Sequence, residues 1–160
     1  MTLFQDIRLT TRRWTIRPAV EADQATLSEI YLTARRSTFT WVDPARFHIE
    51  DFAVQSKGER VFVCESDDGT VAGFMAIWEA DEFIHMLYIR SEFQGGGAGR
   101  ALLKALPGWP RRRYRLKCLV KNSRARRFYE RMGFVVTGQG ASAEGEYNDM
   151  LLGPATARTG

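Results

Sequence analysis

The sequence predicts an α/β (α+β) fold, with a mixed central sheet of about six to seven strands flanked by helices. Short apolar runs rich in β-branched and aromatic residues recur along the chain, as is typical of strands. Between them lie segments whose apolar residues repeat at helical spacing. Glycine and proline mark most of the boundaries between these segments. The resulting order of strands and helices suits one mixed sheet with helices on its faces.

The first half of the chain is expected to contain a strand, two helices and a hairpin. In chain order these are a strand over residues 14–17 stopped by Pro18, a helix over 22–36, an aromatic loop over 39–44, a second helix over 47–57, and strands over 61–65 and 71–78. The last two strands should form a hairpin, because the Asp67-Asp68-Gly69 segment between them is a turn sequence.

The second half is expected to alternate strands with helices. In chain order these are a strand over residues 83–89, a helix over 97–106 ended by Pro107 and Gly108, a strand over 114–120, a helix from Asn122 or Ser123 through Met132, and strands over 134–137 and 147–152. Asn122 or Ser123 can cap the second of these helices, and Gly133 can end it. We expect the last two strands to be antiparallel.

Length and composition indicate an ordinary globular protein. We expect a single domain over residues 1–153, with residues 154–160 as a disordered tail. No apolar run is long enough to span a membrane and no signal-peptide pattern is present, so we expect a cytoplasmic protein without a membrane partner. Cys64 and Cys118 are expected to be reduced core thiols. The chain has only two histidines, without ligand spacing, and we expect no metal site.

The most informative segment is residues 94–100, which read Gln-Gly-Gly-Gly-Ala-Gly-Arg between an expected strand and an expected helix. Backbone N–H groups at the start of a helix bind anions, and glycines let the ligand come close. The P-loop pattern is absent from the chain. The dinucleotide fingerprint fails as well, because Arg100 or Leu102 stands where its last glycine belongs. The segment therefore predicts a phosphate-binding loop of another kind.

Charge is distributed unevenly along the chain. Residues 93–129 hold eleven of the 23 Lys and Arg residues and none of the 19 Asp and Glu residues. A basic segment in an otherwise acidic chain favours an anionic ligand on one side and a cationic ligand on the other. The alternatives are a solvated basic surface or a nucleic-acid partner. No helix-turn-helix, zinc-finger or RNA-binding pattern accompanies the segment, so we expect no nucleic acid.

Two motifs resemble those of the GNAT superfamily of N-acetyltransferases. The first, Gln94-x-x-Gly97-x-Gly99-Arg100, is similar to the loop of that family that holds the pyrophosphate of acetyl-CoA. The second, residues 122–134, is similar to the family's Asn-x-x-Ala-x-x-Phe-Tyr-x-x-x-Gly-Phe segment. The resemblance spans residues 14–152 and implies a GNAT-type acyl-CoA N-acyltransferase fold with acetyl-CoA as cosubstrate.

The resemblance also implies which residues bind acetyl-CoA. Backbone groups of residues 87–89 would pair with the pantetheine arm, and the Leu87 amide would polarise the thioester carbonyl. Backbone amides of the glycine loop would hold the pyrophosphate, while Asn122 would contact the pantetheine. The expected cofactor-binding residues are Leu87, Tyr88, Ile89, Gln94, Gly95, Gly96, Gly97, Ala98, Gly99, Arg100, Asn122 and Tyr129.

The implied reaction is direct attack of a neutral amine on the thioester, with Tyr129 as the general acid that protonates the departing thiolate. A phenol suits this role because it is a neutral donor, with a pKa of about 10 against about 8.5 for a thiol. The alternative is that Tyr129 only packs one side of an amphipathic helix.

The expected general base is His85. It stands two residues before Leu87, which predicts that both side chains lie on the same face of the strand. Its position is similar to that of a base histidine in arylalkylamine N-acetyltransferases, and an imidazole titrates in a suitable range. The alternatives are a histidine that only packs in the strand, or a carboxylate base among Glu79, Asp81 and Glu82.

The acceptor is expected to be a primary amine, carried by a small molecule or by a protein or peptide. Asp149, on the last strand, is a candidate for binding it. Phe39, Trp41 and Phe47 are candidates for an aromatic wall of the acceptor pocket, or equally for the core.

Two other functions remain as alternatives. One is a module that binds or senses CoA without catalysis. The other is a nucleic-acid-binding protein that uses Arg111, Arg112 and Arg113, a cluster that also suits a solvated turn. A homodimer is compatible with the resemblance, although no feature of the sequence specifies it.

Overall fold

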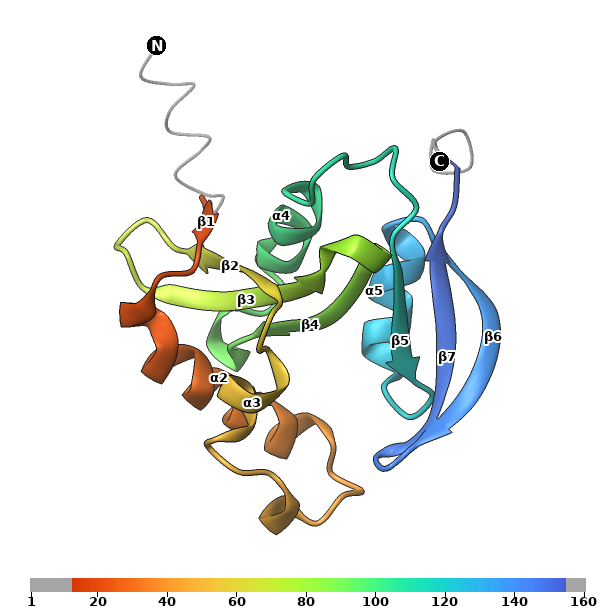
Figure 1. Ribbon diagram of the computed structural model, residues 1–160, viewed down its shortest axis with the longest axis horizontal. Coiled ribbons are helices and arrows are strands. Elements are labelled where there is room, and N and C mark those ends of the chain that lie inside the picture. Colours follow the sequence, from red (N-terminus) through yellow and green to blue (C-terminus); the bar gives the residue numbers. More distant parts are fainter. Residues whose placement is uncertain (1–12, 155–160) are drawn as a thin grey trace.

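The structure is a computed structural model that describes residues 13–154. Of the expected C-terminal tail, only Pro154 belongs to this range, so that expectation otherwise lies outside the described residues. Figure 1 shows the arrangement of the described helices and strands around a central sheet.

The sheet has seven strands in the order β1-β2-β3-β4-β5-β7-β6. Their bounds are β1 Thr15–Pro18, β2 Arg60–Glu65, β3 Val71–Trp78, β4 Phe83–Ile89, β5 Arg115–Leu119, β6 Phe134–Ser142 and β7 Gly145–Leu152. All neighbours are antiparallel except β4 and β5, which are parallel. The predicted mixed sheet of six to seven strands is therefore confirmed.

Helices cover both sides of this sheet. Their bounds are α2 Gln24–Thr38, α3 Asp51–Gln55, α4 Ala98–Lys104 and α5 Ser123–Arg131, with single 3-10 turns at Glu21–Asp23, Pro44–Arg46, Glu79–Asp81 and Ser91–Phe93. In Figure 1, α2 and α3 lie on one side of β2–β4 and α4 on the other, while α5 lies against β5 and β6. The two parts of the sheet diverge from the junction of β4 and β5.

Each side of the sheet has its own core. On the α4 and α5 side, Leu102, Leu103, Leu116, Phe134 and Met150 belong to one buried cluster. On the α2 and α3 side, a second buried cluster consists of Leu27, Ile30, Tyr31, Phe52, Val63, Phe74, Ala76 and Met86. Because β3 is covered on both faces, it is an almost continuous apolar segment and not an alternating one.

Two predicted elements differ most from the structure, while β1 includes Pro18, which was expected to stop it, and β7 begins at Gly145 instead of residue 147. The expected helix over residues 47–57 is only Asp51–Gln55, because Phe47 leaves the helical path to enter a small buried cluster with Phe39 and Val42. Strand β6 continues to Ser142, well beyond the expected end at residue 137. Gly138 and Gly140 interrupt its apolar pattern, yet both pair with β7, and a side chain at Gly140 would collide with the ring of Tyr147.

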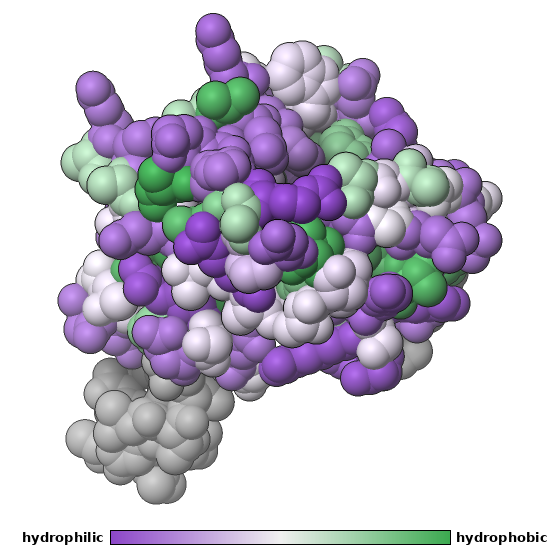
Figure 2. All heavy atoms as spheres, turned by 90° about the horizontal axis from the view of Figure 1, so that it is seen from below, coloured by the Kyte–Doolittle hydropathy of each residue, from purple (hydrophilic) through white to green (hydrophobic). Residues whose placement is uncertain are grey.

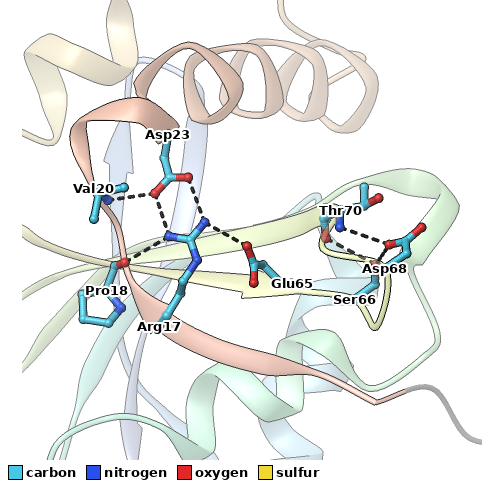
Figure 3. A network of polar contacts seen from close by, with 8 residues as sticks. All are labelled: Arg17, Pro18, Val20, Asp23, Glu65, Ser66, Asp68 and Thr70. Carbon is cyan, nitrogen blue, oxygen red and sulfur yellow. Dashed lines mark hydrogen bonds and ion pairs between the residues drawn. The ribbon is translucent and has the colours of Figure 1, made fainter.

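The short edge strand β1 is held by an ion-pair network (Figure 3). The Arg17 guanidinium donates to both carboxylate oxygens of Asp23, at 2.8 and 2.9 Å, and lies 3.0 Å from the Glu65 carboxylate on β2. Asp23 also accepts from the Val20 amide at 2.8 Å. This network joins β1, β2 and the turn that begins α2.

The surface around α2 and the loop that follows it is mostly hydrophilic, with small separated apolar areas (Figure 2). Within residues 13–154, none of the helices combines the length and the apolar character that a membrane crossing requires.

Candidate active site

A cleft opens where β4 and β5 separate. The two parallel strands pair only at Phe83 with Arg115 and at Ile84 with Leu116, although both strands continue beyond these pairs. Residues Leu87 to Ile89 of β4 pair with β3 but not with β5, and they line a cleft of about 1190 Å³. This volume is large enough for a substantial ligand. Residues of α2 line the cleft on one side of the sheet, and residues of α4 and α5 line it on the other.

The glycine loop lies at the α4 side of the cleft. Gly95 and Gly97 have φ values of 80° and 92°, in the left-handed region that favours glycine, and Gly97 caps α4. Gln94 closes the loop onto β4 by donating to the Ile89 carbonyl at 3.2 Å. Of the expected loop residues, all but Gly96 line the cleft. The Gly96 carbonyl instead accepts from the Trp14 indole at 2.9 Å.

The charged side chains that line the cleft are all basic: Arg100, Lys104, Arg124 and Arg131. They come from α4 and α5, whereas α2 contributes only the uncharged Ala34, Ser37 and Thr38. The cleft therefore suits an anionic ligand at its α4 and α5 side. The eleven basic residues of segment 93–129 are only partly explained by this, because Arg112 pairs with Glu82 at 2.6 Å and Arg113 donates to the Leu152 carbonyl.

Helix α5 begins at the cleft. Asn122 caps it by accepting from the Ala125 amide at 3.2 Å, and Gly133, with a φ of 101°, follows its end. Both expectations for this helix are confirmed. A Cβ at Gly99 would lie only 3.1 Å from the Phe128 ring, so the glycine lets α4 and α5 pack closely along the cleft.

Tyr129 lines the cleft from α5. Its ring packs edge-on against Phe128 and Phe134, at centroid distances of 5.3 and 5.6 Å. Its hydroxyl has no hydrogen-bond partner among the described residues. Burial raises the pKa of Tyr129, and the nearby Cys118 adds to this effect. The side chain is thus a neutral phenol with a free hydroxyl in the cleft.

Tyr88 contributes a second hydroxyl, which the sequence did not indicate because only its backbone was expected to act. Its ring lies on the α2 side, 5.2 Å from Tyr31 and 6.0 Å from Phe74. Its hydroxyl also lacks a hydrogen-bond partner in the described range. Burial is the main reason that the pKa of Tyr88 is raised.

His85 does not lie on the same face as Leu87, so that expectation was wrong. Ala76 pairs with Met86 and Ile77 with Ile84, which leaves His85 as the extra residue of a β-bulge. Ile84 and Leu87 pack on the α4 side, whereas Met86 packs on the α2 side. His85 therefore faces the α2 side and is not among the residues that line the cleft.

Glu59 is the partner of His85 and was missed in the sequence. Its Oε2 lies 2.7 Å from His85 Nδ1, and its side chain is only 8% exposed. Its Oε1 is buried without a hydrogen-bond partner. Burial raises the pKa of the Glu59 carboxyl, although the charge and hydrogen bond of His85 act in the opposite direction. No sequence motif could have identified Glu59, because it meets His85, 26 residues away in the chain, only in the folded protein.

Two of the three rival carboxylates in and after the Glu79–Asp81 turn are ion-paired. Glu79 pairs with Arg60 and Arg112, and Glu82 pairs with Arg112. Asp81 lies in the same turn, and its carbonyl accepts from Arg115. None of the three lines the cleft.

The aromatic residues expected near the acceptor are divided between core and loop. Phe39 and Phe47 are buried in the cluster with Val42, so they belong to the core. Trp41 packs against this cluster and donates to the Glu144 carbonyl at 2.6 Å, which joins the loop after α2 to the β6–β7 turn. Asp149 lies on β7 opposite Gly138.

Both cysteines are buried free thiols, as predicted. Burial raises the pKa of Cys64 and of Cys118 to about 11 in each case. Neither thiol is therefore a ready nucleophile near neutral pH. Within residues 13–154, no group of three or more His, Cys, Asp and Glu side chains is arranged to hold a metal ion.

The chain is similar to known acetyltransferases. Residues 57–136 match a family described as an acetyltransferase (GNAT) domain. The "5-NmdU N-acetyltransferase" of Pseudomonas phage PaMx11 is 30% identical over 122 residues, which cover 73% of this chain and 86% of that protein.

Solved structures share the fold. YjaB from Escherichia coli has a TM-score of 0.72 at 22% identity, covering 89% of this chain and 99% of that one. The yncA protein from Salmonella typhimurium, solved with its cofactor acetyl-CoA, has a TM-score of 0.63 at 26% identity, covering 88% of this chain and 93% of that one.

Proposed function

This chain belongs to the GNAT family of acetyltransferases, which use acetyl-CoA, and from that premise we propose that it transfers the acetyl group directly to a primary amine, with Tyr129 as general acid and His85 as general base. The observation that carries the proposal is the cleft between β4 and β5, which combines a glycine loop and basic side chains with the Tyr129 hydroxyl, while the His85–Glu59 pair lies outside its lining.

The residues on the α4 and α5 side of the cleft fit the anionic part of acetyl-CoA. Backbone amides of the loop before α4 are open to a ligand because the positions that approach it most closely are glycines. Arg100, Lys104, Arg124 and Arg131 supply positive charge to phosphate groups. The unpaired edge of β4 at residues 87–89 offers backbone hydrogen bonds to the pantetheine arm.

Acetyl-CoA supplies an activated acyl carbon and a thiolate leaving group. In the proposed step the amine nitrogen bonds to that carbon, the C–S bond breaks, and the sulfur takes a proton from the Tyr129 hydroxyl. The raised pKa of Tyr129 keeps the phenol protonated until this moment. The Leu87 amide, on the part of β4 that does not pair with β5, donates in this proposal to the carbonyl oxygen as it gains negative charge.

The amine must also lose a proton. His85 lies on the α2 side of the sheet, at the point where β4 and β5 begin to separate, but outside the cleft lining. We therefore assign it a role as base through an intervening water, with Glu59 fixing the orientation of its ring. The pairing of His85 Nδ1 with Glu59 leaves Nε2 to accept the proton.

The phage relative is named for 5-NmdU, and an acceptor of that kind is one candidate for this chain. The proposal is tested by measuring thiol release from acetyl-CoA with a panel of small amines, amino acids, peptides and 5-NmdU. We expect release that depends on at least one amine. Release that is independent of every amine, or absent, would contradict acetyl transfer and favour a module that only binds CoA.

A further inference from the structure

Trp14, the residue just before β1, reaches the glycine loop from outside it. Its indole N–H donates to the Gly96 carbonyl at 2.9 Å, although the two residues are 82 positions apart in the chain. Neither of the two motifs of the sequence contains Trp14. The contact links the first strand of the sheet to the loop that is proposed to hold the pyrophosphate of acetyl-CoA.

The Trp14 ring is held in place by its surroundings. It is half-buried, packs against the core cluster on the α4 side, and meets the Phe93 ring edge-on at 6.0 Å between centroids. Three residues further along the chain, Arg17 is fixed to Asp23 and Glu65 by ion pairs (Figure 3). Because both the ring and the following strand are anchored, the indole N–H is presented in a defined direction.

The glycine loop has little conformational preference of its own. Residues 95–97 are three consecutive glycines, two of them with positive φ, and glycine adopts either sign of φ with similar ease. The Gln94 side chain ties the start of the loop to β4, and the Gly97 carbonyl ties its end to α4 by accepting from the Ala101 amide at 2.9 Å. The peptide between Gly96 and Gly97 lies between these two anchors, so a further contact is needed to fix its orientation.

The Gly96 carbonyl determines where the next N–H group points. The peptide after Gly96 is trans, and in a trans peptide the C=O and the following N–H point in opposite directions. Because the Gly96 oxygen faces Trp14, the Gly97 N–H faces away from it. Gly97 lines the cleft, whereas Gly96 and Trp14 do not.

We propose that Trp14 is a positioning residue for acetyl-CoA, which keeps the Gly97 N–H turned into the cleft by holding the Gly96 carbonyl. The inference rests on the part of the proposed function that places acetyl-CoA at the glycine loop. A rotated peptide would present the Gly96 oxygen to the phosphates in place of an N–H group. The cofactor would then bind only the fraction of molecules whose peptide has the correct orientation.

The first test compares Trp14→Phe with Trp41→Phe. Phenylalanine keeps an aromatic ring but has no N–H group. Trp41 is a matched control, because its indole donates to the Glu144 carbonyl at 2.6 Å and lies outside the cleft lining. We expect the Kd of acetyl-CoA, measured by calorimetry, to rise about fivefold in Trp14→Phe, as one net hydrogen bond allows, and to change by less than about twofold in Trp41→Phe. An unchanged Kd in Trp14→Phe, or equal losses in both variants, would overturn the proposal.

A second readout separates the orientation of this peptide from a general loosening of the loop. Gly97 has a φ of 92°, which alanine disfavours, so in Gly97→Ala the peptide that Trp14 orients is already displaced. Adding Trp14→Phe to this variant should cost no further affinity for acetyl-CoA. In the single variant Trp14→Phe, kcat at saturating acetyl-CoA should equal that of the wild type. Additive losses of affinity, or a lower kcat at saturation, would overturn the assignment.

The wild type distinguishes a failure of this inference from a failure of the proposed function. If it binds acetyl-CoA but acetylates no amine, the proposed transfer is overturned, while the Kd values still decide the role of Trp14. If it binds no acetyl-CoA, both are overturned.

Discussion

His85 Nδ1 lies 2.7 Å from Glu59 Oε2, a contact that joins the bulge of β4 to the segment just before β2. The carboxylate is almost fully buried, whereas the imidazole is 34% exposed. A buried carboxylate that accepts from one ring nitrogen fixes both the ring orientation and the tautomer of a histidine. The contact uses Nδ1 and leaves the other nitrogen, Nε2, outside the pair.

Removing His85 should change the pH dependence of the reaction. In His85→Ala we expect kcat/KM to fall about 10²-fold near neutral pH, the lower end of what general base catalysis contributes. The pH–rate profile should also change its shape, because the group that takes the proton from the amine is lost. His48→Ala is a matched control, because His48 is the other histidine of the chain and is exposed. A pH–rate profile of His85→Ala that keeps the shape of the wild type would remove His85 from the mechanism.

Glu59 should act only through His85. Glu59→Gln keeps the shape of the side chain but removes its charge, so we expect a loss of kcat with little change in KM for acetyl-CoA. The double variant Glu59→Gln/His85→Ala should be no slower than His85→Ala alone, because the effects of coupled residues are not additive. Additive losses in this cycle would show that Glu59 supports the fold independently of the histidine.

Tyr129→Phe tests the general acid. The ring contacts with Phe128 and Phe134 are retained, so only the hydroxyl is lost. We expect kcat to fall about 10²-fold, while the Kd of acetyl-CoA measured by calorimetry stays within about twofold. Tyr147→Phe, on β7 and outside the cleft lining, serves as control. Full activity of Tyr129→Phe would leave the departing thiolate without its assigned proton donor.

The glycine loop can be tested by a pair of alanine variants. Gly97 and Gly69 have similar left-handed φ values of 92° and 84°, and in neither case would an added Cβ meet an atom closer than 3.4 Å. Each alanine should therefore cost about 1–2 kcal/mol of stability for backbone reasons alone. Only Gly97 lines the cleft. We expect the Kd of acetyl-CoA to rise at least about tenfold in Gly97→Ala and to stay unchanged in Gly69→Ala. If the two variants bound acetyl-CoA with equal Kd, the glycine loop would not be its binding site.

Acid should weaken the network around β1. The hydrogen bonds from Arg17 are the main reason that the pKa of Asp23 is lowered in the folded protein. A lowered pKa contributes stability above the unfolded value of about 3.9, and this contribution is lost as the pH falls toward the folded pKa. Urea unfolding should thus show Asp23→Asn to be less stable than wild type by about 1–3 kcal/mol at pH 7. The difference should shrink below pH 4, and a gap that is constant with pH would contradict the linkage.

Much of the fold was accessible from local patterns. Strands β3 and β4 have the predicted bounds, because Val71–Trp78 and Phe83–Ile89 are apolar runs between turn residues, broken only by Gly73 and His85. The capped start of α5 at Asn122 and the loop before α4 also follow from residue type alone. These features depend on backbone conformation and hydrogen bonds within a few residues.

The features that could not be predicted from the sequence depend on strand register and on contacts between residues far apart in the chain. A bulge moves His85 to the other face of β4, and nothing in the run Phe83–Ile89 marks where pairing will slip. Glu59, distant from His85 in sequence, becomes its partner only once the fold brings the start of β2 near β4. The same holds for Phe47, whose burial with Phe39 replaces the expected helix with a turn.

Direct acetyl transfer is tested by following a labelled acetyl group from acetyl-CoA in the presence of an accepted amine. Direct transfer predicts that label appears on the amine in the same amount as free CoA thiol, with none on the denatured protein. Buried Cys118, with its pKa raised to about 11, is not expected to carry it. Label retained on the protein, or released as acetate with the amine unmodified, would contradict direct transfer in this cleft.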